Sequence, residues 1–121
     1  MQKKARGHHA EQAAARYLKE QGLSIHSSNF TCRAGEIDLV AQDGDSLVFV
    51  EVRARRTGAL VGSADSVGVT KRKRLIRAAR FYLHRYALND CFCRFDLVAV
   101  EIQFDHHYRF EWIRNAFDTT P

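Results

Sequence analysis

The sequence has little proline and little cysteine. Its only proline is the last of 121 residues, and its three cysteines are Cys32, Cys91 and Cys93. An odd number of cysteines argues against a disulfide framework, and the spacing of Cys91 and Cys93 is not that of the usual zinc knuckle. We therefore favour free thiols over a structural zinc site.

The chain also lacks long hydrophobic runs. No apolar segment approaches the roughly 20 residues that cross a bilayer, and the amino terminus lacks the apolar core of a secretory signal. No repeat or low-complexity segment divides the chain, and 45% of its residues are hydrophobic. We therefore expect one cytoplasmic domain spanning residues 1–121. The net charge of +5 is compatible with a polyanionic partner but is too small to establish one.

Two segments rich in β-branched and aromatic residues, 35–41 and 46–53, flank a Gln-Asp-Gly-Asp sequence and predict a β-hairpin. Each arm carries an acid, Asp38 or Glu51. In an antiparallel hairpin with a loop of even length, opposed residues share a face and their numbers have an odd sum. Asp38 and Glu51 meet this condition, so we expect both carboxylates on one face, together with Arg53.

Two neighbouring carboxylates repel each other unless a cation lies between them, and an unpaired buried carboxylate is costly. Oxygen ligands suit Mg²⁺ or Mn²⁺. The hairpin therefore predicts a divalent-cation site at Asp38 and Glu51. Glu36 shares the face of Asp38 by alternation; it is a further candidate ligand, although an ion pair at the sheet edge is the favoured interpretation.

Two segments have the period of an amphipathic helix. The first runs from Gly7 to Gln21 and ends at Gly22. Glu11 borders its apolar stripe, so its side chain need not project straight into water. The alternative interpretation is a solvated acid in the first turn, favoured by the helix dipole. The stripe consists of Ala10, Ala13, Ala14, Tyr17 and Leu18.

The second helix is predicted from Thr70 to Ala87, with Thr70 as its cap. Its apolar stripe consists of Leu75, Ile76, Ala79, Leu83 and Tyr86. It opens with four cations, Lys71, Arg72, Lys73 and Arg74, which oppose the helix dipole at about 0.3–1 kcal/mol each. A nucleic-acid backbone would pair with these cations and with the free amides of the helix start. An over-charged solvated face is the alternative.

Further strands are predicted over 23–30, 94–102 and 108–113. The glycine-containing segment 55–68 predicts a loop, and we expect residues 57–68 to be the least ordered internal part of the chain. Arg33, before the hairpin, and Arg55, after it, are candidate phosphate contacts. The order helix, three strands, helix, two strands predicts an α/β domain with a mixed sheet flanked by helices.

An acid followed by a hairpin and a Glu-x-Lys sequence resembles the nuclease motif of the restriction-endonuclease-like and Holliday-junction-resolvase-like families. Here Arg53 stands at the position of the lysine. The chain is more closely similar to the YraN-like family of predicted endonucleases, over nearly its whole length. The matching residues include Gly7 and Glu11, then Gly35-Glu36-Ile37-Asp38-Leu39 and Phe49-Val50-Glu51-Val52-Arg53, and later Lys71, Arg94-Phe95-Asp96 and Asn115-Ala116-Phe117.

This resemblance implies a restriction-endonuclease-like fold and a metal-dependent endonuclease that hydrolyses DNA, with branched or otherwise structured DNA as a candidate substrate. Asp38, Glu51 and Glu11 would hold Mg²⁺ or Mn²⁺ with the Val52 carbonyl. Arg53 would stabilise the transition state but, as a permanently protonated guanidinium, could not accept a proton. A non-catalytic nucleic-acid-binding or assembly module that keeps the fold is the alternative, and a homodimer is compatible with either.

Overall fold

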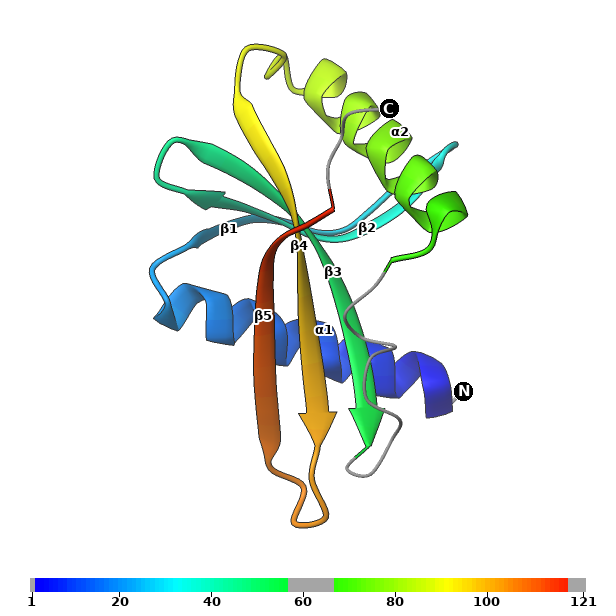
Figure 1. The fold of residues 1–121 in the computed structure, drawn as a ribbon, viewed down its shortest axis with the longest axis vertical. Coiled ribbons are helices and arrows are strands. Elements are labelled where there is room, and N and C mark those ends of the chain that lie inside the picture. The colour runs from blue at the N-terminus through cyan, green and yellow to red at the C-terminus, as the bar shows by residue number, and fades with distance from the viewer. Residues whose placement is uncertain (1, 57–66, 118–121) are drawn as a thin grey trace.

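The computed structural model describes residues 2–56 and 67–117. Its elements are α1 (Gln2–Glu20), β1 (Ser24–Cys32), β2 (Gly35–Asp43), β3 (Ser46–Arg56), α2 (Val69–Arg85), β4 (Phe92–Ile102) and β5 (Tyr108–Phe117). The strands form one sheet in the order β1-β2-β3-β4-β5, in which β3 and β4 are parallel and the other neighbours antiparallel (Figure 1). The predicted single α/β domain, with its element order and mixed sheet, is confirmed.

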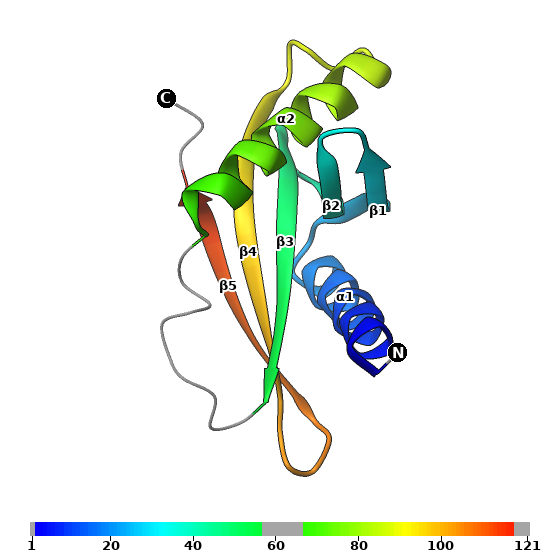
Figure 2. The same ribbon diagram turned by 90° about the vertical axis from the view of Figure 1, so that its right-hand side faces the viewer.

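The two helices pack on opposite faces of this sheet. Ala10, Ala14 and Leu18 of α1 pack with the even-numbered Val48 and Val50 of β3. On the other face, α2 contributes a buried group, Leu75, Ala78, Ala79 and Tyr82, which packs with Leu47 and Phe49 of β3. In Figures 1 and 2, α2 lies along the half of the sheet where β3 and β4 begin, and α1 along the half where they end.

The first helix ends where predicted and begins earlier than predicted. Gly22 has φ of 102°, and its N–H donates to the Lys19 carbonyl, which closes the last turn. The helix starts at Gln2 instead of Gly7. Because the residues before Gly7 are mostly strong helix formers, a single glycine does not stop it. No helix within the described ranges is long and apolar enough to cross a membrane.

Two details of the second helix differ from prediction. Its cap is Gly68, in extended conformation and without a side-chain hydrogen bond, so Thr70 is not the cap but lies inside the helix. Tyr86 is not part of the buried stripe and is 49% exposed. Tyr82 is the last buried residue of the helix and Leu83 is partly buried against the same cluster, whereas Tyr86 follows the helix end at Arg85 and no longer keeps the helical period.

Three strands extend beyond their predicted ends, and the extensions relocate two arginines. β1 continues to Cys32 and is joined to β2 by Arg33 and Ala34, so Arg33 is exposed in that tight turn. β3 continues to Arg56, so Arg55 lies in a strand and not at the start of a loop. Most of the predicted mobile loop, residues 57–66, lies outside the described residues.

The third extension, that of β5 to Phe117, is tied down by Asp96. This residue of β4 is 1% exposed and accepts hydrogen bonds from Arg94 Nε at 3.0 Å, Trp112 Nε1 at 2.9 Å and the Asn115 amide at 3.1 Å. Arg94 also donates to Asp43 at 2.8 Å. A buried carboxylate is stable when its oxygens are satisfied in this way, so the network fixes β5 against β4.

Candidate metal centre

The centre of the candidate site is the point at which β2 separates from β3. The two strands pair from Asp43 with Ser46 as far as Leu39 with Val50, which confirms the predicted hairpin and leaves Asp38 and Glu51 as the first residues beyond the paired region. Beyond Val50, β3 remains paired with β4 while β2 turns away together with β1 (Figure 1). A gap between strands therefore opens beside Asp38.

An unusual residue in β1 accompanies this separation. Asn29 lies across from Asp38, between the pairs Ser28–Leu39 and Phe30–Ile37, and has φ of 56°. Asparagine tolerates this left-handed conformation better than most residues. Ile37 packs in the cluster under α2 and Leu39 in the cluster under α1, although residues two apart share a face in a regular strand. The strand therefore rotates about its axis at Asp38.

A backbone group released by the separation holds the Asp38 side chain. The Val52 N–H donates to Asp38 Oδ2 at 2.8 Å, in place of a bond to a strand carbonyl. Burial raises the pKa of Asp38 to about 8, helped by the negative charge of Glu51, a side-chain hydrogen bond with Glu51 and the charge of Glu11, and opposed by the Val52 bond. The carboxyl groups of Asp38 and Glu51 thus lie close together, as predicted.

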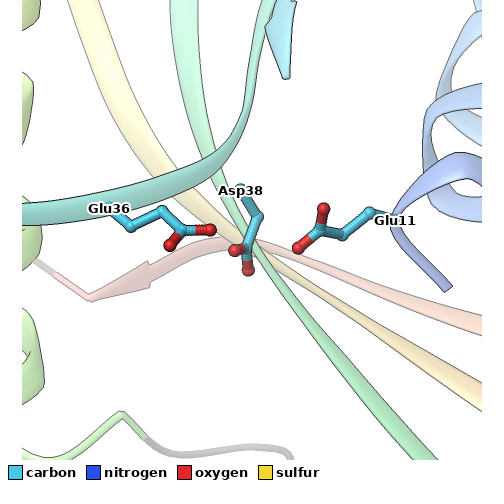
Figure 3. A group of neighbouring side chains, drawn as sticks. All are labelled: Glu11, Glu36 and Asp38. Carbon is cyan, nitrogen blue, oxygen red and sulfur yellow. The ribbon is translucent and has the colours of Figure 1, made fainter. Parts of the chain in front are cut away.

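Three carboxylates converge here. Glu11, Glu36 and Asp38 each place one oxygen so that all three atoms lie within 4.8 Å of one another. Figure 3 shows Glu11, from α1, and Glu36, from β2, on opposite sides of Asp38. Burial also raises the pKa of Glu11, an effect reduced by hydrogen bonds with Asp38 and Asn29 and increased by the charge of Glu36. Three crowded oxygens of this kind fit a hard divalent cation such as Mg²⁺ or Mn²⁺.

Glu51 has a different partner from the other acids. Its side chain is 9% exposed, and its Oε2 lies 3.2 Å from Lys71 Nζ at the start of α2. Glu51 is therefore beside Asp38 but is not in the group of three converging oxygens found among the described residues. Lys71 offsets part of the negative charge that Glu51 brings to the site.

Two further predicted site residues, Arg53 and Arg55, lie in β3 and are both partly buried. Arg53 is partly buried in β3, opposite Ala99 of β4. Arg55, predicted as a phosphate contact, is paired with Glu111 of β5, Nη2 to Oε1 at 3.6 Å, and its side chain is 22% exposed. The longer β3 places Arg55 in the sheet, and its contact with phosphate stays a prediction.

The basic start of α2 stays close to the acidic group. Lys73 and Arg74 are exposed and Arg72 is partly buried. The Cβ of Arg74 would lie 3.7 Å from a Cβ built on Gly35, so α2 approaches the first residue of β2, which is next to Glu36. The predicted anion-binding helix start and the predicted cation site are thus neighbours.

Sequence reasoning gave too little weight to Glu36 and Asn29. Alternation already placed Glu36 on the face of Asp38. Whether Glu36 is a candidate metal ligand or an ion-pair partner depends on where Glu11 lies, because the three acids form one group only in the folded chain. An asparagine inside an otherwise β-like segment was the available signal for Asn29, because left-handed residues outside glycine are most often Asn or Asp.

Comparisons with known proteins agree on one family. The family model described as "Uncharacterised protein family UPF0102" matches residues 10–100, which include all four acids of the site. The chain is similar to a UPF0102 protein of Chromohalobacter salexigens, with 50% identity over 113 residues, 93% of this chain and 90% of the relative. It is also similar to a UPF0102 protein of Marinobacter nauticus, with 47% identity over 110 residues, 91% and 89% of the two chains. A UPF0102 protein of Pseudomonas aeruginosa is 45% identical over 117 residues, 93% and 92%.

Proposed function

Because the chain belongs to the UPF0102 family, as its resemblance to YraN-like proteins implied, and that family is described as uncharacterised, we propose a function from the site itself: a metal-dependent endonuclease that hydrolyses phosphodiester bonds of DNA. The observation that carries this proposal is the convergence of Glu11, Glu36 and Asp38 where β2 leaves β3. A folding requirement alone does not explain neighbouring acids of which one, Asp38, is so far buried that its pKa rises to about 8, helped by the charges of Glu51 and Glu11.

The acids would share the binding of one Mg²⁺ or Mn²⁺ ion. Asp38, Glu11 and Glu36 supply converging oxygens, and Glu51 and the Val52 carbonyl are the remaining candidate ligands. When bound, such an ion activates water and neutralises charge that develops on the phosphate. The chain's own contribution is orientation: the Val52 N–H fixes the Asp38 carboxylate at 2.8 Å. This bond holds the carboxylate in place before any substrate arrives.

Two cations next to the acids would act on the phosphate. Arg53 can stabilise negative charge but cannot accept a proton, because guanidinium stays protonated. Lys71 comes from α2 and already lies 3.2 Å from Glu51, so it brings an ammonium group to the site that the hairpin motif itself does not supply. Lys73 and Arg74 are exposed on the same helix start and would bind phosphates of the DNA other than the one that is cut.

A cleavage screen tests the proposal. Wild-type protein is incubated with single-stranded, duplex, flap and four-way-junction DNA in Mg²⁺, in Mn²⁺ and in EDTA. We expect cleavage of at least one substrate that requires the metal, is abolished by Asp38→Asn and is unchanged by the matched control Asp45→Asn in the hairpin turn.

One pattern of results would favour the alternative, a nucleic-acid-binding module without catalysis. If wild type cuts none of the substrates, and wild type and Asp38→Asn bind DNA equally well, the acids are structural and the nuclease proposal is wrong. Lys71 is the observation that keeps this alternative open, because its ion pair already satisfies Glu51 without a metal.

A further inference from the structure

A polar groove continues from the acidic group along α1. The cavity has a volume of about 480 Å³ and lies between α1 and β1. Its lining residues are His8, Glu11, Gln12, Ala15, Arg16 and Lys19 of α1 with Ser28 and Asn29 of β1. Glu11 and Asn29 belong to both the groove and the acidic site, so whatever occupies the groove reaches the candidate metal centre.

The chemistry of the lining restricts the occupant. The α1 residues recur at intervals of three and four, so they form one stripe along the helix. Seven of the eight lining residues are polar or charged, the exception is the small Ala15, and the only ring is the imidazole of His8. With no Phe, Tyr or Trp in the lining, the groove offers at most one ring for stacking a base. It suits a hydrated, anionic ligand.

Two cations lie beyond Glu11 in the groove. Arg16 and Lys19 are both exposed. The helix dipole accounts for Lys19, which lies in the last turn, but its effect falls off within that turn and does not account for Arg16. At 1.5 Å per residue, Lys19 lies about 12 Å from Glu11 along the helix axis. The axial rise per nucleotide of a duplex strand is ~3.4 Å. The stretch of helix from Glu11 to Lys19 is therefore long enough to lie beside about three nucleotides of a strand.

We propose that this groove binds the sugar–phosphate backbone of one nucleic-acid strand, on one side of the bond cut at the acidic group. Arg16 and Lys19 pair with phosphates, while Gln12 and Ser28 donate hydrogen bonds to backbone oxygens. Contacts of this kind position a strand without reading its sequence. The inference rests on the proposed function, since it identifies the groove as the surface along which the bound strand continues beyond the acidic group.

The test compares wild type with the double variant Arg16→Gln, Lys19→Gln. The matched control removes the same charge from exposed positions on α2, with Arg77→Gln and Arg80→Gln. Affinity for a labelled strand of arbitrary sequence is measured in EDTA over a range of salt. We expect the groove variant to bind at least tenfold more weakly than the control at low salt. Its slope of log affinity against log salt should be smaller by up to about 0.7 per lost contact on single strands, or 0.9 on duplex.

A second measurement locates the contact. Substrates are shortened from one side of the cleaved bond at a time, and cleavage by wild type and by the groove variant is compared. Shortening the substrate on the side bound by the groove should abolish the difference in cleavage between wild type and the groove variant. Shortening it on the other side should leave that difference unchanged. A defect that persists on substrates trimmed at either side would overturn the inference.

The two readouts separate failure of the inference from failure of the proposed function. If the protein cuts DNA but the groove variant keeps the wild-type salt slope, the groove inference is wrong and the nuclease proposal stands. If the variant loses affinity and slope although no substrate is cut, the groove is upheld as a backbone site and the nuclease proposal falls. Unchanged melting temperatures of the variants, expected because both side chains are exposed, exclude misfolding as the cause.

Discussion

Replacing Asp38 by Asn should stabilise the metal-free protein at alkaline pH and leave it unchanged at acidic pH. The pKa of Asp38 is raised from its usual 3.8 to about 8, chiefly by burial and by the charge of Glu51. Between these two values the folded chain holds a proton that the unfolded chain releases. The free energy of unfolding of wild type should therefore fall as the pH rises from about 4 to about 8.

The size of the effect follows from the same values. A pKa difference of one corresponds to about 1.4 kcal/mol, so the change from 3.8 to about 8 sets an upper limit of about 6 kcal/mol. The carboxyl group is only partly buried and titrates together with Glu51 and Glu11, so we expect a gain of about 1–3 kcal/mol for Asp38→Asn at pH 8. The amide oxygen of Asn can still accept the Val52 hydrogen bond, which limits the loss.

Urea unfolding in EDTA at several values between pH 4 and pH 9 measures this directly. The curves of wild type and Asp38→Asn should meet near pH 4 and separate above it, while Asp45→Asn should follow wild type. Saturating Mn²⁺ should then stabilise wild type at pH 8 and have little effect on Asp38→Asn. Parallel curves, or a variant that is less stable at pH 8, would refute the account of a crowded, partly desolvated carboxylate.

Three further predictions concern other parts of the molecule. In a kinetic assay, Arg53→Lys should preserve or increase metal-dependent cleavage and Arg53→Ala should reduce it strongly, since only the lysine variant keeps a cation beside the phosphate. Equal cleavage rates of these two variants would exclude a role of Arg53 in stabilising the transition state. Replacing Lys71, Lys73 and Arg74 by Ala should flatten the salt dependence of DNA affinity by up to about 0.9 per lost duplex contact, and a wild-type slope would place the binding surface elsewhere. Asp96→Ala should cost about 3–5 kcal/mol in urea unfolding because it leaves buried donors and a paired Arg unsatisfied, and a loss below about 1 kcal/mol would contradict the network.

Local patterns in the sequence predicted most of the fold. The hairpin around Gly44 and the apolar stripe of α1 depend on residue periodicity and turn chemistry, and both were placed correctly. The ends of β3 and β5 were not, because they depend on contacts with distant residues. Arg55 joins a strand through its neighbours in β4 and β5, and Asn115 through its bond to Asp96. No window of sequence around either residue contains that information.

The candidate site was predictable in part for a similar reason. Asp38 and Glu51 could be paired because they belong to one hairpin, in which a parity argument fixes the face. Lys71 could be recognised as a cation but not as the partner of Glu51, because α2 reaches β3 only through the packing of the sheet. The rotation of β2 at Asp38, which brings Glu11 and Glu36 together, depends on the conformation of a residue in another strand, Asn29.

The hydrogen bond from Val52 to Asp38 has a practical consequence. A single backbone amide is held 2.8 Å from Oδ2 of the Asp38 carboxyl group. Its ¹H–¹⁵N resonance in a labelled sample should therefore shift as that carboxylate gains or loses a proton or a metal ion. One NMR cross-peak, observed without substrate or activity, would thus report the electrical state of the whole centre.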